Sequence, residues 1–196
     1  LMLDTRPSSV FTAGFIPNSI SIGLDGQFAP WVGSLIPNIE QKIILITEEG
    51  HEEESVKRLS RVGYDKTIGF LKGGFHAWTA ENKEVDSISR ITAVDLAKTM
   101  DAKTLVIDVR KPGEFEAEHV EGAKSIPLDF INDLMGEFPK NDPFILHCAG
   151  GYRSVIASSI LKSRGYDAII DVIGGFSAIA KTSIATTKFS CSSNAK

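Results

Sequence analysis

Cys148 is the side chain in this sequence whose neighbours most clearly favour chemistry. It ends the short apolar run 144–147 and is followed by Gly150, Gly151 and Arg153 as a helical pattern begins. Paired glycines let successive backbone N–H groups turn inward, and a helix N-terminus adds positive field at the same point. Both effects favour a thiolate, and a guanidinium nearby can pair with an anionic substrate. The pattern predicts a nucleophilic cysteine in a strand–loop–helix turn.

A simpler interpretation of Cys148 competes with this one. An isolated free cysteine is more often a buried structural residue than a nucleophile. The Gly-Gly-x-Arg-Ser stretch that follows directly at a helix entry favours the functional interpretation. A pairing with His147 is not expected, because alternation along a strand sends that side chain to the opposite face.

Composition restricts the function classes. The chain has 196 residues and a net charge of −4, with neither a long apolar run nor a clustered basic stripe. These features indicate no membrane span and no nucleic-acid partner. Two cysteines, Cys148 and Cys191, cannot form a disulfide framework, and a reactive thiol needs a reducing compartment, so a cytoplasmic location is expected.

The chain is an internal repeat. Residues 1–11 match residues 105–115, and further matches continue at offsets between 101 and 104 along both halves. Two copies of one unit of about a hundred residues follow from this. A helical lead-in at 91–100, with Thr92 as its N-cap, precedes the second copy only. The sequence therefore predicts that the first copy is truncated at its N-terminus.

An α/β fold is expected, with two domains that each have a mainly parallel sheet and helices on both faces. In the second copy the expected order is strand 105–109, short helix 112–119, strand 123–126, helix 130–138, strand 144–148, helix 153–164 and strand 168–172. Short apolar strands that alternate with helices are typical of such sheets.

The predicted boundaries are 1–86 for the first unit, 87–182 for the second and 183–196 for a flexible tail, with a linker at 87–90. We use the names first unit and second unit below.

Several motifs of the second unit resemble the rhodanese (sulfurtransferase) domain in order and along its whole length. They are D-x-R at 108–110, HVEGAKSIP at 119–127, HCAGGYRS at 147–154, SRGYD at 163–167 and GGF at 174–176. The resemblance implies that Cys148 carries a sulfane sulfur as a persulfide. It also implies substrate-binding roles for the residues that follow, which are Ala149, Gly150, Gly151, Tyr152, Arg153 and Ser154. Arg110 and Phe176 are expected at the pocket rim.

The implied activity is a sulfurtransferase that needs no metal or cofactor. Thiosulfate or a low-molecular-weight persulfide would donate sulfur to Cys148, and a thiol or cyanide would accept it. Phosphatases of related fold carry one more residue between the cysteine and the arginine, so the loop length at 148–153 favours sulfur over phosphate. The tandem also resembles the C-terminal part of fusions between a metallo-β-lactamase-fold hydrolase and rhodanese domains. The alternative is therefore a non-catalytic docking or sulfur-relay module of such an enzyme.

The first unit departs from the motif at the critical position. Thr47 replaces the cysteine, and a hydroxyl cannot hold a transferable sulfur. The carboxylates around it would repel an anionic donor; they are Glu48, Glu49, Glu52, Glu53 and Glu54. A metal site that joins them to His51 is the alternative to a solvated helix start, which the helix dipole favours. We expect a catalytically silent unit that supports the active one.

Residues that recur in the silent unit are interpreted as scaffold. Asp108 and Arg110 recur as Asp4 and Arg6, and the glycine pair with Phe176 recurs at 73–75. A structural hydrogen-bonding role is expected for His119, whereas Glu114 and Glu118 are expected to be solvated. Cys191 is interpreted as a bystander thiol in the tail.

Overall fold

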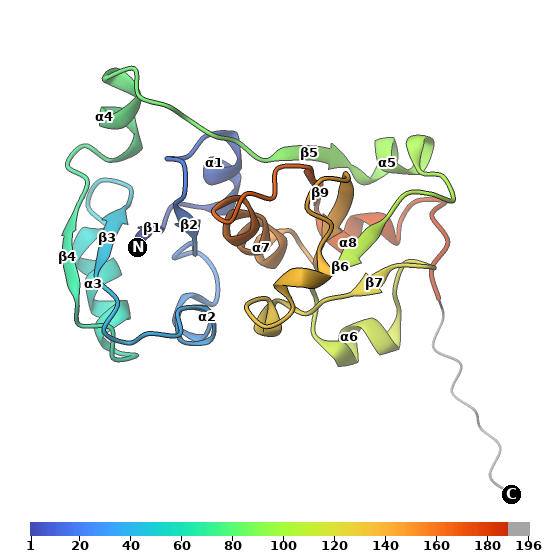
Figure 1. Cartoon of the computed structure of the whole chain (residues 1–196), viewed down its shortest axis with the longest axis horizontal. Helices are drawn as coiled ribbons and strands as arrows, with labels where there is room; N and C mark the ends of the chain where they lie inside the picture. The colour runs from blue at the N-terminus through green and yellow to red at the C-terminus, as the bar shows by residue number, and fades with distance from the viewer. Residues whose placement is uncertain (188–196) are drawn as a thin grey trace, which may run out of the picture.

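The computed structural model describes residues 1–187 and contains two parallel sheets in succession along the chain (Figure 1). The first unit contains β1 (Met2–Asp4), α1 (Ser8–Ala13), β2 (Ile20–Ser21), α2 (Phe28–Leu35), β3 (Ile43–Ile46), α3 (Glu52–Ser60), β4 (Thr67–Phe70) and α4 (Gly74–Ala80). The second unit contains β5 (Ser89–Thr92), α5 (Ala93–Thr99), β6 (Val106–Asp108), α6 (Pro112–Ala117), β7 (Lys124–Ser125), the 3-10 turns η1 (Leu128–Phe130) and η2 (Met135–Glu137), β8 (Phe144–His147), α7 (Tyr152–Lys162), β9 (Ile169–Ile173) and α8 (Gly175–Ile179).

The strand order explains where the candidate loop lies. The sheets run β2-β1-β3-β4 and β5-β9-β8-β6-β7, and all the strand pairs within them are parallel. Cys148 directly follows β8, whose neighbours are β6 and β9. The carboxyl ends of parallel strands share one edge of the sheet, and this is where ligands bind in open α/β sheets. The α/β prediction with two parallel sheets is confirmed.

The predicted helix at 130–138 is wrong. The segment instead forms η1 and η2, which are short 3-10 turns separated by irregular chain. Asn132 and Asp133 compete with helical hydrogen bonds, Gly136 lowers helix propensity, and Pro139 disfavours helical angles in the residue before it. Burial of Ile131 still anchors the segment in the core.

The predicted linker at 87–90 is wrong at residues 89 and 90. Ser89–Thr92 forms β5, which pairs in parallel with β9 at the edge of the second sheet. Arg90 reaches the buried Asp171 at 2.9 Å, so the pairing is reinforced by an ion pair. The predicted N-cap is confirmed, because Thr92 Oγ1 accepts the Asp95 N–H at 3.1 Å.

The described part of the predicted tail lies against the second unit. Thr186 forms an isolated antiparallel bridge with Val120, and the Thr187 N–H donates to the carbonyl of His119 at 2.8 Å. Residues 186 and 187, which the prediction places in the tail, therefore contact the second unit. Cys191 lies outside the described residues.

Helix α7 lies between the two units and is buried on nearly every side (Figure 1). It packs on its own strands β8 and β9 and also on α1 and β2 of the first unit. Apolar side chains therefore do not form a single stripe around α7, as expected for a helix surrounded by protein. The buried Ser159 Oγ accepts the Ser21 N–H at 2.9 Å across the boundary. One continuous apolar core includes Leu3 and Trp31 from the first unit and Ile156 from α7.

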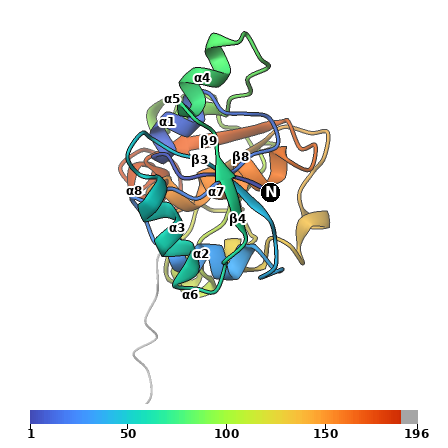
Figure 2. The ribbon, with the colours of Figure 1, turned by 90° about the vertical axis from the view of Figure 1, so that its left-hand side faces the viewer.

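The outer face of the first sheet is less covered than that of the second. Side chains from α5 and α8 cover Val106 and Ile145 on the second sheet. The first unit has no counterpart of β5 and α5 within residues 1–187, and Ile44 and Ile68 are 41% and 59% exposed. Figure 2 faces this side and shows β4 in front. Among residues 1–187, no helix is long and apolar enough to cross a membrane.

Candidate active site

Cys148 lies at the C-terminal end of β8, directly before the loop that enters α7. The residue is 1% exposed, and the Gly151 N–H donates to its Sγ at 3.1 Å. Gly151 has a φ of 107°, in the left-handed region where a glycine is strongly preferred. The Gly151 N–H group and the N-terminus of the eleven-residue helix α7 thus lie beside the sulfur. This arrangement stabilises negative charge on Sγ.

The first turn of α8 holds the cysteine loop in place through backbone hydrogen bonds. The Phe176 and Ser177 N–H groups donate to the carbonyls of Cys148 and Ala149 at 2.7 and 3.0 Å. Gly175 has a φ of 55°, and a Cβ there would lie 2.4 Å from the Cys148 carbonyl oxygen. The recurring Gly-Gly-Phe motif is therefore a close-packing turn, as the sequence indicated.

Arg110 and Phe176, predicted at the pocket rim, pack against each other. The Arg110 guanidinium lies 4.0 Å from the Phe176 ring centroid, and its Nε donates to Asp108 at 2.8 Å. Neither side chain lines the cleft at Cys148. Arg6 lies 4.3 Å from the Phe75 ring in the same way, although the first unit lacks the cysteine. The arrangement is scaffold in both units.

A cleft of about 430 Å³ opens beside the cysteine. Its lining comes from both units and consists of Gln27, Trp31, Lys111, Glu114, Cys148, Gly150, Tyr152 and Arg153. Four of these residues belong to the predicted loop. Lys111 and Glu114 come from the start of α6, whereas Gln27 and Trp31 come from the first unit.

Arg153 is engaged by the carboxylate of Glu114, whose side chain is partly exposed but is ion-paired and not simply solvated as predicted. The guanidinium Nη1 and Nη2 lie 2.5 and 2.8 Å from the two Glu114 carboxylate oxygens. This bidentate pair lowers the pKa of Glu114 and raises that of Arg153. The pair fixes the arginine fork at the edge of the cleft.

Tyr152 ties the loop to the first unit. Its hydroxyl donates to the carbonyl of Gly23 at 2.8 Å, and its ring lies against Gly26, where a Cβ would come within 2.2 Å of the ring. Burial and the nearby Asp25 carboxylate raise the pKa of the Tyr152 phenol. The hydroxyl therefore acts as a neutral donor.

Two other predicted substrate-binding residues lie outside the cleft lining. Ala149 contributes a carbonyl that binds α8. Ser154 is fully buried, and its Oγ donates to the Gly151 carbonyl at 3.3 Å, so it braces the first turn of α7.

The histidines have structural positions. His147 is fully buried, and its Nδ1 lies 3.2 Å from the carbonyl oxygen of Cys148, not beside Sγ. Burial lowers the pKa of His147 and favours the neutral ring, although the nearby Asp108 carboxylate acts in the opposite direction. His119 Nδ1 lies 2.7 Å from the Phe115 carbonyl oxygen, and the two rings stack.

Three lining residues were missed by the sequence interpretation. Lys111 could have been noticed as a cation directly before the predicted helix at 112. Gln27 and Trp31 belong to the other copy of the repeat, and no local pattern connects them with the loop at 148. Their position follows from how the two units pack.

The first unit keeps the backbone of this site without its chemistry. Thr47 is 4% exposed and its Oγ1 has no partner among the described residues. Gly74 approaches the Thr47 carbonyl as Gly175 approaches that of Cys148, and Gly50 has a left-handed φ of 87° like Gly151. Gly50 is therefore the counterpart of Gly151 in the first unit.

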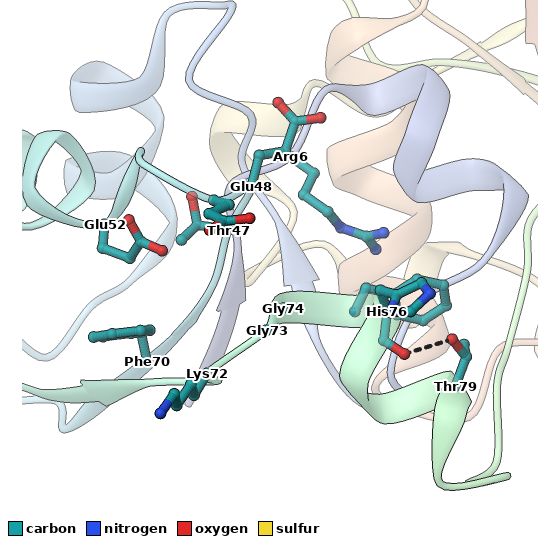
Figure 3. A pocket seen from close by; sticks show the side chains of 12 residues that line it. Arg6, Thr47, Glu48, Glu52, Phe70, Lys72, Gly73, Gly74, His76 and Thr79 are labelled. Carbon is teal, nitrogen blue, oxygen red and sulfur yellow. Dashed lines mark hydrogen bonds between the residues drawn. The ribbon is translucent and has the colours of Figure 1, made fainter.

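A larger cavity of about 980 Å³ lies at Thr47 (Figure 3). Figure 3 shows Glu52 and Phe70 on one side and His76 on the other. Glu52 also lies in the acidic first turn of α3, where the dipole favours carboxylates. Within residues 1–187, no group of three or more His, Cys, Asp or Glu residues is arranged to hold a metal ion.

Known proteins resemble both halves of the chain. The family model for the rhodanese-like domain matches residues 1–81 and 92–182. An uncharacterized protein, YqhL of Bacillus subtilis, is 38% identical over 74 residues, which cover 38% of this chain and 59% of that protein. Thiosulfate sulfurtransferase 16, chloroplastic, of Arabidopsis thaliana is 31% identical over 118 residues, 54% of this chain and 96% of that protein.

Among solved structures, a rhodanese-like domain protein from Staphylococcus aureus is 29% identical, with a TM-score of 0.45. The match covers 50% of this chain and 97% of that one. The family model alone spans most of the sequence in two segments, one in each parallel sheet. The chain therefore belongs to the rhodanese-like domain family.

Proposed function

We propose that the second unit is an active sulfurtransferase that carries sulfane sulfur on Cys148. The position of Sγ supports this most directly, because it accepts the Gly151 N–H at the N-terminus of α7 beside an open cleft. The matched relative named as a thiosulfate sulfurtransferase gives independent support.

The proposed cycle has two displacement steps. With thiosulfate, the Cys148 thiolate attacks the outer sulfur, a new S–S bond forms at Sγ, and sulfite leaves with the electron pair of the broken bond. An acceptor thiol or cyanide then attacks the outer sulfur of the persulfide and regenerates the thiolate. Both steps move electron pairs without net oxidation, so the chemistry requires no metal or cofactor. The thiol must stay reduced, which fits a cytoplasmic location.

The residues around the cleft have separate roles in this proposal. The Gly151 N–H and the α7 dipole stabilise charge on Sγ. Lys111 attracts the anionic donor, and Arg153 shares its charge between Glu114 and the cleft. Tyr152 forms one side of the opening.

Turnover of thiosulfate with cyanide by the isolated chain tests the proposal. We expect thiocyanate formation that requires Cys148 and is lost in Cys148→Ala. A folded, reduced chain without turnover from thiosulfate or a small persulfide would contradict the catalytic proposal.

The alternative is a docking or sulfur-relay module of a larger protein with a metallo-β-lactamase-fold hydrolase. The 980 Å³ cavity of the first unit favours this alternative, because its carboxylates suit a binding role better than sulfur transfer. Turnover by the isolated chain separates the two functions.

A further inference from the structure

The first unit forms one wall of the cleft at Cys148. Gln27 precedes α2, and its exposed side chain makes no capping hydrogen bond to that helix. Trp31, one turn further along, is 4% exposed, and its Nε1–H has no acceptor among the described residues. Both residues line the same cleft as Arg153. An exposed amide side chain and a largely buried indole from the first unit thus line the cleft beside the reactive loop.

This wall is held in a fixed position. The Tyr152 hydroxyl donates to Gly23 at 2.8 Å, and the Ser21 N–H donates to Ser159 at 2.9 Å. Both contacts join the first unit to α7, so the wall and the cysteine loop form one packed body. Gln27 and Trp31 therefore present a defined surface to a ligand.

The cleft is larger than a compact inorganic dianion requires. Its volume of about 430 Å³ lies in the range of about 300–1,000 Å³ typical of pockets for organic ligands. Its charged side chains are two cations, Lys111 and Arg153, and one carboxylate, Glu114. Aromatic surface from Trp31 and Tyr152 adds apolar wall. A ligand with an organic body and carboxylate groups matches this lining better than thiosulfate does.

We propose that α2 of the first unit and the residue before it form an organic-thiol subsite, in which Gln27 and Trp31 bind the body of a carboxylate-bearing persulfide. This inference rests on the proposed function and specifies its donor. In the reaction the Cys148 thiolate attacks the terminal sulfur of R–S–SH. The bond between the two donor sulfurs breaks, R–S⁻ leaves with its electron pair, and the proton stays on the terminal sulfur of Cys148–S–SH.

Donor preference tests the subsite. The full chain is loaded with glutathione persulfide or with thiosulfate, and the kcat/KM of Cys148 persulfidation is measured for each. We expect the ratio of the first to the second to fall about tenfold in Gln27→Ala and in Trp31→Phe. The matched controls Gln41→Ala and Trp78→Phe lie outside the cleft and should leave the ratio unchanged. Circular dichroism and melting temperature establish that all four variants fold.

An unchanged ratio in both cleft variants would overturn the subsite while leaving Cys148 persulfidation intact. No adduct from either donor on the unaltered chain would instead remove the proposed function and the subsite with it.

Fluorescence gives a second readout that does not depend on turnover. The sequence has two tryptophans, so Trp78→Phe leaves Trp31 as the single indole. Saturable quenching or a spectral shift on adding reduced glutathione, but not sulfite, would support the subsite. An identical response to the two, or no response to either, would contradict it.

Discussion

Cys148 and Thr47 stand at the same point of two copies of one fold, yet only one of them can carry sulfur. The loop after each strand uses a left-handed glycine, Gly151 or Gly50. Each loop also packs against a second glycine, which is Gly175 of α8 or Gly74 of α4. The backbone of the site is therefore retained where the chemistry is absent. The difference lies in a few side chains, which shows that the scaffold is maintained independently of the function placed on it.

The two units also differ in what surrounds the loop. Helix α7 is enclosed by both units, whereas α3 bears exposed ion pairs such as Lys57 with Glu53 on its outer surface. The active loop therefore gains a wall from its neighbour. We infer that the silent unit persists as part of the active site as well as part of the core.

The largest expected effect on turnover comes from removing the thiol at Cys148 and then introducing one at Thr47. Cys148→Ala should lower turnover by at least about 10³-fold, because no other described side chain can hold the sulfane sulfur. Adding Thr47→Cys to that variant should not restore activity, because carboxylates such as Glu48 and Glu52 line the cavity at Thr47. Thiocyanate formation measures both. Restored turnover in the double variant would show that the scaffold alone is sufficient.

Gly175 and Gly74 pack against the Cys148 and Thr47 carbonyls and allow the same substitution to be compared in the two units. Alanine at Gly175 or Gly74 would require a left-handed φ and would place Cβ 2.4 or 2.9 Å from a carbonyl oxygen. We expect each variant to lose about 1–3 kcal/mol of unfolding free energy. Only Gly175→Ala should also lower the turnover of the folded protein, by about tenfold or more, because it displaces Cys148. Urea unfolding and kcat measure the two effects, and equal turnover losses would contradict the assignment of roles.

The contact between Gly26 of the first unit and Tyr152 of the second predicts a smaller effect on kcat/KM. Gly26→Ala would drive Cβ to within 2.2 Å of the Tyr152 ring, so the ring and the cleft edge must shift. We expect kcat/KM to fall several-fold. Gly33→Ala in α2 is the control, since a Cβ there meets nothing within 4 Å, and it should stabilise the protein by about 0.5–1 kcal/mol. Unchanged kinetics in Gly26→Ala would show that Tyr152 does not shape the cleft.

The smallest expected effect concerns acid stability. Arg153 lowers the pKa of Glu114 in the folded state, so the pair stabilises the fold fully above the unfolded pKa of about 4.3. This contribution is lost as the pH falls through the lower folded pKa. Because the carboxylate is 37% exposed, the contribution should not exceed about 1 kcal/mol.

Glu114→Gln should therefore lower the melting temperature at neutral pH and reduce its further loss on acidification. Melting curves between about pH 3 and 7 measure this change. Parallel curves for the variant and the unaltered chain would contradict the role of the pair.

Local patterns predicted most of the fold. The strands at 105–109 and 144–148, the N-cap at Thr92 and the loop at Cys148 all depend on neighbouring residues, and each appears near its expected place. The prediction of a helix at 130–138 is wrong because it relies on the apolar spacing and gives too little weight to the helix breakers Gly136 and Pro139.

The parts of the site that sequence did not reveal depend on distant contacts. Glu114 meets Arg153 across 39 positions of the chain, and no spacing rule connects a short helix after β6 with the N-terminus of α7. Trp31 reaches the cleft only through the packing of two units on α7. Such contacts are determined by the docking of preformed elements, which a single sequence does not encode in a readable pattern.

Intact-protein mass spectrometry of the reduced chain can detect sulfur bound to Cys148 without any assumption about the acceptor. We expect that thiosulfate or glutathione persulfide adds the mass of one sulfur atom, that cyanide removes it, and that Cys148→Ala never acquires it. A sulfur adduct that persists in Cys148→Ala, or no adduct on the folded, reduced chain with either donor, would contradict the claim that Cys148 carries the transferred sulfur.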